Sequence, residues 1–360
     1  MKKARNNRTK KMKKRSFKPS GKRGLFDEQQ TKQQLTSIGN PLEAISKVID
    51  FEMFRGLLEE KLNNPKRKSN AGARPYDYVM MFKIMILQRY YGLGDKQVEY
   101  QIIDRTSFKD FLGLDTGDKV PDEKTIWAFR ETLTKSGLVE ELFLKFKQYL
   151  QSKELIFNEG QLIDASFTVA PRQRNTREEN AKIKAGDGDD LWNDRPQKKS
   201  HKDIDARWTK KNGETFYGYK NHSKVDSKSK FINDYTVTDA SVHDSQALDD
   251  LLDDNDAGQQ LHADSAYTGE EQEKTIARYK MINQVNEKGY RNKPLTSEQK
   301  ESNRQKSKTR ARVEHVFGFM EQSMHGLYVR SVGIARATGI IGLINLTYNI
   351  FRFEQVVRLA

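Results

Sequence analysis

The chain has 360 residues, of which 35% are hydrophobic and 32% are charged, and its formal net charge at pH 7 is +14. A single hydrophobic core rarely grows beyond roughly 250–300 residues, so this length predicts two domains. The absence of cysteine excludes disulfides and cysteine-ligated zinc, and the longest apolar run, residues 79–87, is much shorter than the roughly 20 residues of a membrane span. We therefore expect a cytoplasmic protein without a membrane partner.

Residues 1–23 form a basic arm with twelve Lys or Arg and no acidic residue, so the rest of the chain carries only +2 of the total charge. A block of like charges with few apolar residues repels itself and is typically disordered until it meets a polyanion. The arm lacks the apolar region of a secretory signal. It is suited to releasing counterions from DNA phosphates, which raises affinity without reading sequence.

Residues 24–155 are predicted to form an all-α domain. Apolar side chains at helical spacing mark two buried faces: Met80, Ile84, Leu87 and Tyr91 on one helix, and Ile126, Phe129 and Leu133 on another. We expect Asp95 and Asp122 to cap helices here. Lys124 and Arg130 are predicted to point outward, as in a helical module that contacts DNA, although a bundle with both side chains in water fits the same pattern.

The pattern changes to that of strands after residue 156. Short runs rich in β-branched and aromatic residues predict strands at residues 161–170, 215–226, 231–240 and 258–267, and helices are expected at 243–254 and 269–280, before a short strand at 281–285. Thr296 and Gln299 form a capping box that opens a long helix reaching Glu314. Residues 156–360 are therefore predicted to form an α+β or α/β domain, a mixed sheet with flanking helices.

Residues 171–213 interrupt this pattern with twelve Lys or Arg, eight Asp or Glu and few apolar residues. Such a segment cannot bury a core of its own, which predicts a long functional loop or a segment that becomes ordered on DNA.

Three acidic residues are candidates for a metal site: Asp164 in QLIDASFTV, Asp264 in LHADSAY and Glu314 in SKTRARVEHVFGFME. A carboxylate beside apolar residues is costly to bury unless it is paired, hydrogen-bonded or bound to metal. Such a set can hold Mg²⁺, which prefers oxygen ligands, and two ions could support an in-line displacement at phosphorus. Arg310, one helical turn before Glu314, could orient it or contact a phosphate, whereas an ordinary surface ion pair would have the same spacing.

The sequence also resembles a known family over most of its length. The matching stretches are GLFD, NPLEAISKVIDFEMFR, ARPYDYVMMFKIMILQRYYGLGD, DRTSFKDFLGL, VPDEKTIWAFRE, PRQRNTREEN, DARWTKKNGETFYGYKNH, VTDASVHDSQALDDLL, ADSAY, SKTRARVEHVFG and NLTYNIFR. Together they resemble bacterial insertion-sequence transposases of the DDE type, specifically the insertion-sequence-five family. The resemblance implies a ribonuclease H-like catalytic domain after a helical DNA-binding domain.

The same resemblance implies roles for individual residues. Asp164 would bridge two Mg²⁺ or Mn²⁺ ions, and Asp264 and Glu314 would each complete the ligands of one ion. The implied partners are double-stranded DNA, as element ends and as target, and a second copy of the chain in a dimer assembled on DNA. Candidate DNA-contacting residues are Lys124, Arg130, Arg172, Arg174, Lys220 and Arg312.

One position departs from the family pattern, in which Ser307, Arg310 and Glu314 would be followed by a basic residue. The chain has Glu321 at that place, and Lys308, Arg312 or Arg330 could replace the missing charge. Two alternatives therefore stay open beside an active transposase: a DNA-binding relative with weakened catalysis, and a host nuclease with a ribonuclease H-like core.

Overall fold

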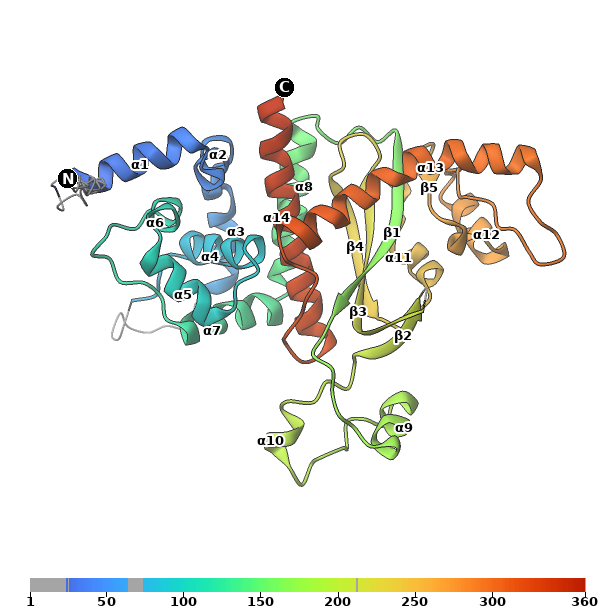
Figure 1. The fold of residues 1–360 in the computed structure, drawn as a ribbon, viewed down its shortest axis with the longest axis horizontal. Coiled ribbons are helices and arrows are strands. Elements are labelled where there is room, and N and C mark those ends of the chain that lie inside the picture. Colours follow the sequence, from blue (N-terminus) through green and yellow to red (C-terminus); the bar gives the residue numbers. More distant parts are fainter. Residues whose placement is uncertain (1–23, 25, 64–73, 212, 360) are drawn as a thin grey trace, which may run out of the picture.

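The computed structural model of the chain describes residues 24, 26–63, 74–211 and 213–359. The basic arm expected at residues 1–23 lies outside the described residues. The first half of the chain is helical and the second half forms a mixed sheet with helices on both faces, as predicted (Figure 1).

The N-terminal helices that the structure describes are α1 (Asp27–Ile38), α2 (Pro41–Val48), α3 (Arg55–Leu62), α4 (Tyr78–Tyr90), α5 (Asp95–Asp104), α6 (Thr106–Leu112), α7 (Glu123–Lys135) and α8 (Leu138–Ser152), with a short 3-10 turn at Phe51–Phe54. Helix α4 is buried on nearly all sides rather than along one stripe, because other helices pack around it. Among the described residues, no helix has both the length and the apolar character needed to cross a membrane.

The two predicted caps have different outcomes. Asp122 caps α7 as expected, since its carboxylate accepts a hydrogen bond from the backbone N–H of Thr125 at 2.7 Å. The prediction for Asp95 is wrong, because Gly94 is the N-cap of α5 and Asp95 is the first helical residue. The carboxylate of Asp95 instead pairs with Arg130 on α7, a contact that local sequence spacing does not reveal.

The sheet contains β1 (Gly160–Val169), β2 (Arg207–Lys211), β3 (Glu214–Asp226), β4 (Ile232–Asp239), β5 (Gln260–His262) and β6 (Ile282–Asn283). Its order is β2-β3-β1-β5-β6, and β4 pairs with the part of β3 that β2 leaves open. β3 runs antiparallel to β1, β2 and β4, whereas β5 runs parallel to β1 and β6. The mixed sheet is confirmed, but the sequence analysis missed β2, which lies inside the polar segment 171–213.

Alternate residues of β1 face opposite layers of helices. Leu162 belongs to the large core shared with α13 (Ser297–Gly318) and α14 (Ile334–Leu359). Its neighbour Ile163 belongs to a smaller core shared with α11 (Leu248–Leu251) and α12 (Glu270–Arg278). The period of two along a strand therefore places Asp164 on the side of α13 and α14.

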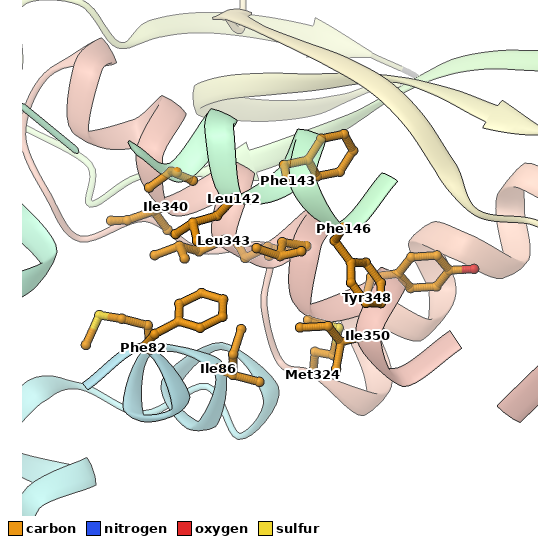
Figure 2. Close-up of a cluster of buried hydrophobic side chains, with 14 of the residues drawn as sticks. Phe82, Ile86, Leu142, Phe143, Phe146, Met324, Ile340, Leu343, Tyr348 and Ile350 are labelled. Carbon is orange, nitrogen blue, oxygen red and sulfur yellow. The ribbon is translucent and has the colours of Figure 1, made fainter. Parts of the chain in front are cut away.

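The large core is continuous between the N-terminal helices and the sheet. Figure 2 shows Phe82 and Ile86 of α4 and Phe146 of α8 near Ile340 and Leu343 of α14. Helix α14 packs against α4 and α8 as well as against β4. The C-terminal helix thus joins both parts of the chain.

The polar segment between β1 and β2 is more ordered than its composition predicts. It contains α9 (Arg177–Ala185) and α10 (Pro196–Lys199), which extend away from the sheet (Figure 1). Trp192 is buried between them, and its indole N–H donates to Glu179 at 2.6 Å. The ammonium group of Lys198 lies 5.0 Å from the centre of the Trp192 ring. This single buried aromatic side chain gives the segment a small core, which its sparse apolar residues did not predict.

Candidate active site

Asp164 in β1 and Asp264, two residues after the end of β5, lie at the same level. The expected strand at 258–267 is therefore shorter than predicted, and Asp264 is instead the N-cap of the 3-10 turn Ser265–Tyr267. The last registered pair between β1 and β5 is Leu162 with His262, and each aspartate follows two residues later. Adjacent strands are about 4.8 Å apart. Because side chains alternate between the two faces with a period of two, each aspartate points to the same face as the residue of that pair two positions before it, so the two aspartates share one face. Residues a hundred positions apart in the chain are thereby brought together where β5 ends beside the middle of β1.

Arg310 connects Asp164 to Glu314. On α13, Arg310 places Nη1 3.2 Å from Oδ2 of Asp164 and Nη2 2.7 Å from Oε1 of Glu314. The Asp164 side chain is 15% exposed, whereas that of Glu314 is 58% exposed. Glu314 is therefore linked to the buried aspartate through a guanidinium group, and its carboxylate is largely in solvent.

The carboxyl group of Asp164 is electrostatically unusual. Burial, together with the nearby charge of Asp264, raises its pKa to about 6, although the backbone N–H of Ala165 and the charge of Arg310 oppose the shift. The hydroxyl of Tyr267 is buried and has no hydrogen-bond partner in the described part of the chain. Burial and the charges of Asp164, Asp244 and Asp264 raise the pKa of Tyr267 well above its ordinary value, so this hydroxyl keeps its proton.

These groups fit a divalent cation in part. Two carboxylates on one face supply the oxygen ligands that Mg²⁺ prefers, and Mg²⁺ often takes only one or two carboxylates together with water and phosphate. A cation would also relieve the repulsion between Asp164 and Asp264. Within the ranges that the structure describes, however, no three His, Asp or Glu side chains group closely enough to hold an ion, so Glu314 does not join the two aspartates in this arrangement.

Two of the expected DNA-contacting side chains are not on the surface. Arg130 is 8% exposed and pairs with Asp95, so the prediction that it points outward is wrong. Lys220 is 7% exposed, and its ammonium group donates to Asp244 at 2.7 Å. In both cases a carboxylate distant in the sequence compensates the buried charge.

The other candidates for DNA contact differ in their surroundings. Lys124, Arg172 and Arg174 are exposed, and the guanidinium of Arg172 lies 5.6 Å from the ring centre of Trp208. Arg312 is exposed but donates to the backbone carbonyl of Ser227 at 2.7 Å, which fixes it at the turn between β3 and β4.

The sequence analysis missed three buried polar residues: Tyr267, Asp244 and His222. Tyr267 is close to Asp164, Asp244 and Asp264, whose charges act on its hydroxyl, whereas His222 pairs with Ala165 and lies on the other face of the sheet from Asp164. Tyr267 follows Asp264 by three residues, and the buried 3-10 turn at Ser265–Tyr267 carries its ring beneath the sheet. Asp244 and His222 gave no local signal, because their burial depends on strand pairing and on the Lys220 ion pair.

Glu321 does not continue the face of α13 that carries Glu314. A π-helical turn at Phe319–Ser323 ends the helix, and it changes the angular step between successive side chains. The spacing of seven residues would place Glu314 and Glu321 on one face of an uninterrupted α-helix, but the π-helical turn prevents this. Glu321 is exposed.

Comparison with known proteins decides the family. A family model described as "Transposase DDE domain" matches residues 157–350, which is more than half of the chain. The chain belongs to the DDE transposase family. A second model, "Transposase domain (DUF772)", matches residues 29–132 of this transposase. Members of DDE transposase families generally use divalent metal ions.

Among solved structures, the transposase is similar to one described as a piggyBac transposase synaptic complex with hairpin DNA. The sequence identity is 12% and the TM-score is 0.43, with 90% of this chain and 76% of the other covered.

Proposed function

We propose that this transposase binds the terminal inverted repeats of an insertion sequence, cleaves the DNA at the element ends and joins the freed 3′-OH to target DNA. The main support is that Asp164 on β1 and Asp264, two residues after β5, lie at one level, with Arg310 bound to Asp164. The specific relationship to the insertion-sequence-five family and the ribonuclease H-like nature of the sheet domain belong to the same proposal.

The carboxylates and Arg310 have separate tasks in this proposal. Divalent ions, when bound, activate the attacking oxygen and stabilise the leaving one. Asp164 and Asp264 hold the cationic centre in place through strands that are fixed in the sheet. Arg310 can move from Asp164 to a DNA phosphate, because a guanidinium forms bidentate hydrogen bonds with phosphate as well as with carboxylate.

Release of Arg310 also frees Glu314. The Glu314 carboxylate is mostly exposed and its ion pair with Arg310 is confined to one helical turn. Several rotatable bonds let the side chain turn towards Asp164 once that pair is broken. The active arrangement of three carboxylates therefore requires DNA, an ion, or both to displace the guanidinium.

The reaction consists of two transfers at phosphorus. In the first, water attacks a phosphodiester, the bond to the 3′ oxygen breaks, and the 5′-phosphate remains on the flanking DNA. In the second, the 3′-OH attacks a target phosphodiester and displaces another 3′ oxygen. Residues 24–155 would hold the element end, with the exposed Lys124 as a contact, and the exposed Arg172 and Arg174 of segment 171–213 would add further contacts. Synapsis of two ends requires a dimer on DNA.

The first experiment measures cleavage of a duplex that carries the inverted repeat flanking the gene, with Mg²⁺ or Mn²⁺. Asp164→Asn and Asp264→Asn should abolish nicking while end binding stays within about twofold, because the carboxylates act after binding. Glu314→Gln should give the same result. Wild-type nicking by any one variant removes that residue from the proposed site.

A second experiment supplies a pre-cut end with a free 3′-OH and scores its joining to plasmid DNA. Joining supports transposition. Cleavage without joining indicates a nuclease of the same fold, and end binding without cleavage by the unaltered chain indicates a catalytically weakened relative.

A further inference from the structure

A cavity of about 340 Å³ lies between the N-terminal helices and the segment that precedes α14. Its walls come from the turn between α4 and α5, from α7, from residues 325–331 and from the first turns of α14. The volume is at the small end of the range for small-molecule sites, roughly 300–1,000 Å³. None of the triad residues Asp164, Asp264 or Glu314 lines it.

The cavity carries an excess of positive charge. Arg89, Arg130 and Arg330 line it, whereas Asp95 is the one acidic residue among its described lining residues. Both terminal nitrogens of Arg130 donate to Asp95, with Nη2 2.8 Å from Oδ2. This pair occupies the carboxylate of Asp95. Its charge also acts on Arg89, but among the described residues neither Arg89 nor Arg330 forms an ion pair of its own.

Arg89 is the less exposed of these two. Its Nε is buried and has no hydrogen-bond partner within the described residues. Burial lowers the pKa of Arg89 to about 10, and the charge of Arg130 contributes to the decrease. The group is still protonated at neutral pH, and a buried charge without a partner is costly unless an anion compensates it.

The backbone adds to the positive potential. Gly94, the N-cap of the ten-residue helix α5, lines the cavity, so the positive end of the helix dipole faces it. Gly92, at φ +62, lets the chain approach the opposite wall, where an added Cβ would lie 2.9 Å from Cβ of His325. Arg330 is at the exposed rim, 5.7 Å from the ring centre of Tyr328.

The cavity is physically connected to the strand that carries Asp164. The backbone N–H of Val169 donates to Leu327 at 3.0 Å, and that of Val329 donates to Val169 at 2.9 Å. Val169 is five residues beyond Asp164 on β1. At about 3.3 Å per residue the separation along the strand is roughly 16 Å, or about five nucleotide steps of a DNA strand.

We propose that this cavity binds one phosphate group of the DNA, with Arg89 and Arg330 donating to it from the floor and the rim. The inference rests on the proposed function, in which DNA is the substrate. The phosphate can be an internal diester or the terminal phosphate of a cut strand. Guanidinium groups suit either form because their planar N–H groups match pairs of phosphate oxygens.

The first test uses inorganic phosphate and the full chain. Phosphate should raise the melting temperature of the wild type by a few degrees relative to chloride at equal ionic strength, since a ligand that binds only the folded state stabilises it. Arg330→Ala, at the exposed rim, should lose this effect. Arg358→Ala removes a guanidinium from the far end of α14 and is the matched control, which should respond like the wild type.

The second test measures affinity for a short duplex as a function of salt. Loss of one phosphate contact should flatten the slope of log K against log salt by about 0.9 and weaken binding roughly tenfold. Because both arginines hold the same phosphate, Arg89→Gln with Arg330→Ala should flatten the slope no more than Arg330→Ala alone. A doubled change would show two separate contacts, and an unchanged slope in Arg330→Ala would overturn the proposal.

Duplexes with and without a 5′-phosphate at one end distinguish the two sources. An Arg330→Ala defect that disappears on the 5′-hydroxyl duplex identifies a terminal phosphate, and an equal defect on both identifies an internal diester. If the wild type shows the inorganic phosphate effect but does not bind or cut element ends, the proposed function fails while the anion site stands. If the wild type cleaves element ends normally and Arg330→Ala leaves the salt slope unchanged, the anion site fails while the proposed function stands.

Discussion

Nη1 of Arg310 lies 3.2 Å from Oδ2 of Asp164. The guanidinium therefore occupies a position at which a cation would neutralise this buried carboxylate. The guanidinium also binds Glu314, so one side chain keeps the third carboxylate apart from the two aspartates. In the proposed function, this arginine would compete with metal for the same negative charge in the DNA-free chain.

Arg310→Ala should therefore increase the affinity of the DNA-free chain for Mn²⁺. We expect roughly a tenfold gain, equivalent to about 1.4 kcal/mol, because a positive charge beside Asp164 is removed. Titration calorimetry gives the affinity directly. Arg312→Ala is the control, since its guanidinium binds the carbonyl of Ser227 and not a carboxylate of the site. Equal or weaker Mn²⁺ binding by Arg310→Ala would contradict the competition.

Deletion of residues 1–23 should lower affinity for all duplexes by similar factors and reduce the salt dependence of binding. The twelve basic residues of this segment release counterions without reading sequence. A chain of equal length, with these residues replaced by Ser and Gln, separates charge from length. If the salt slope is the same in the intact and the substituted chain, the arm does not contact DNA.

The contribution of His222 to the stability of the transposase should decrease as the pH falls below about 6.5, whereas Asp164, whose pKa is raised, contributes in the opposite direction. Burial lowers the pKa of His222 to about 4; the charge of Asp244 opposes this shift, and the charge of Lys220 adds to it. The hydroxyl of Thr238 donates a hydrogen bond to the carbonyl of Asp239, so its oxygen accepts one from Nε2 of His222. Nδ1 of His222 is buried without a hydrogen-bond partner in the described residues, which agrees with a neutral ring.

The direction of the pH effect depends on whether the folded or the unfolded chain binds a proton at His222 more readily. Above pH 6.5 His222 is neutral in both states and has no effect on the pH dependence. Between pH 6.5 and about 4 only the unfolded chain is protonated, so the free energy of unfolding falls by up to about 1.4 kcal/mol per pH unit. Urea unfolding at several pH values should show a shallower decrease for His222→Gln. Exposed His201 provides the control His201→Gln, and a curve for His222→Gln that matches wild type would exclude this origin.

Two glycine substitutions should have opposite effects on stability. At Gly342 in α14, an added Cβ would lie 2.8 Å from Cγ1 of Val139 and would overlap the hydroxyl of Tyr235. Gly342→Ala should therefore lower the free energy of unfolding by about 1–3 kcal/mol. Gly318 in α13 has no atom within 4 Å of an added Cβ, and Gly318→Ala should raise it by up to about 1 kcal/mol. Urea unfolding measures both, and a neutral Gly342→Ala would show that α14 and β4 can separate without cost.

Local patterns predicted most of the secondary structure. The capping box of Thr296 and Gln299 opens α13, and the cap of Asp122 opens α7, because each depends on residues within one helical turn. Strands β1, β3 and β4 follow the runs that were identified from their β-branched and aromatic residues. The short strand β2 escaped notice because its charged sequence RWTKK gains order only by pairing with β3.

By itself, the sequence determined the two-part organisation, the helical and strand segments, and the three acidic residues that are candidates for metal binding, since periodicity and capping act over a few residues. Only the tertiary structure decided that Arg130 and Lys220 are buried, that Arg310 separates Glu314 from Asp164, and that Arg89 faces a cavity without a carboxylate partner. The physical reason is that the energy of a charge depends on which groups replace its water. Those groups come from segments that are distant in the chain and meet only in the folded protein.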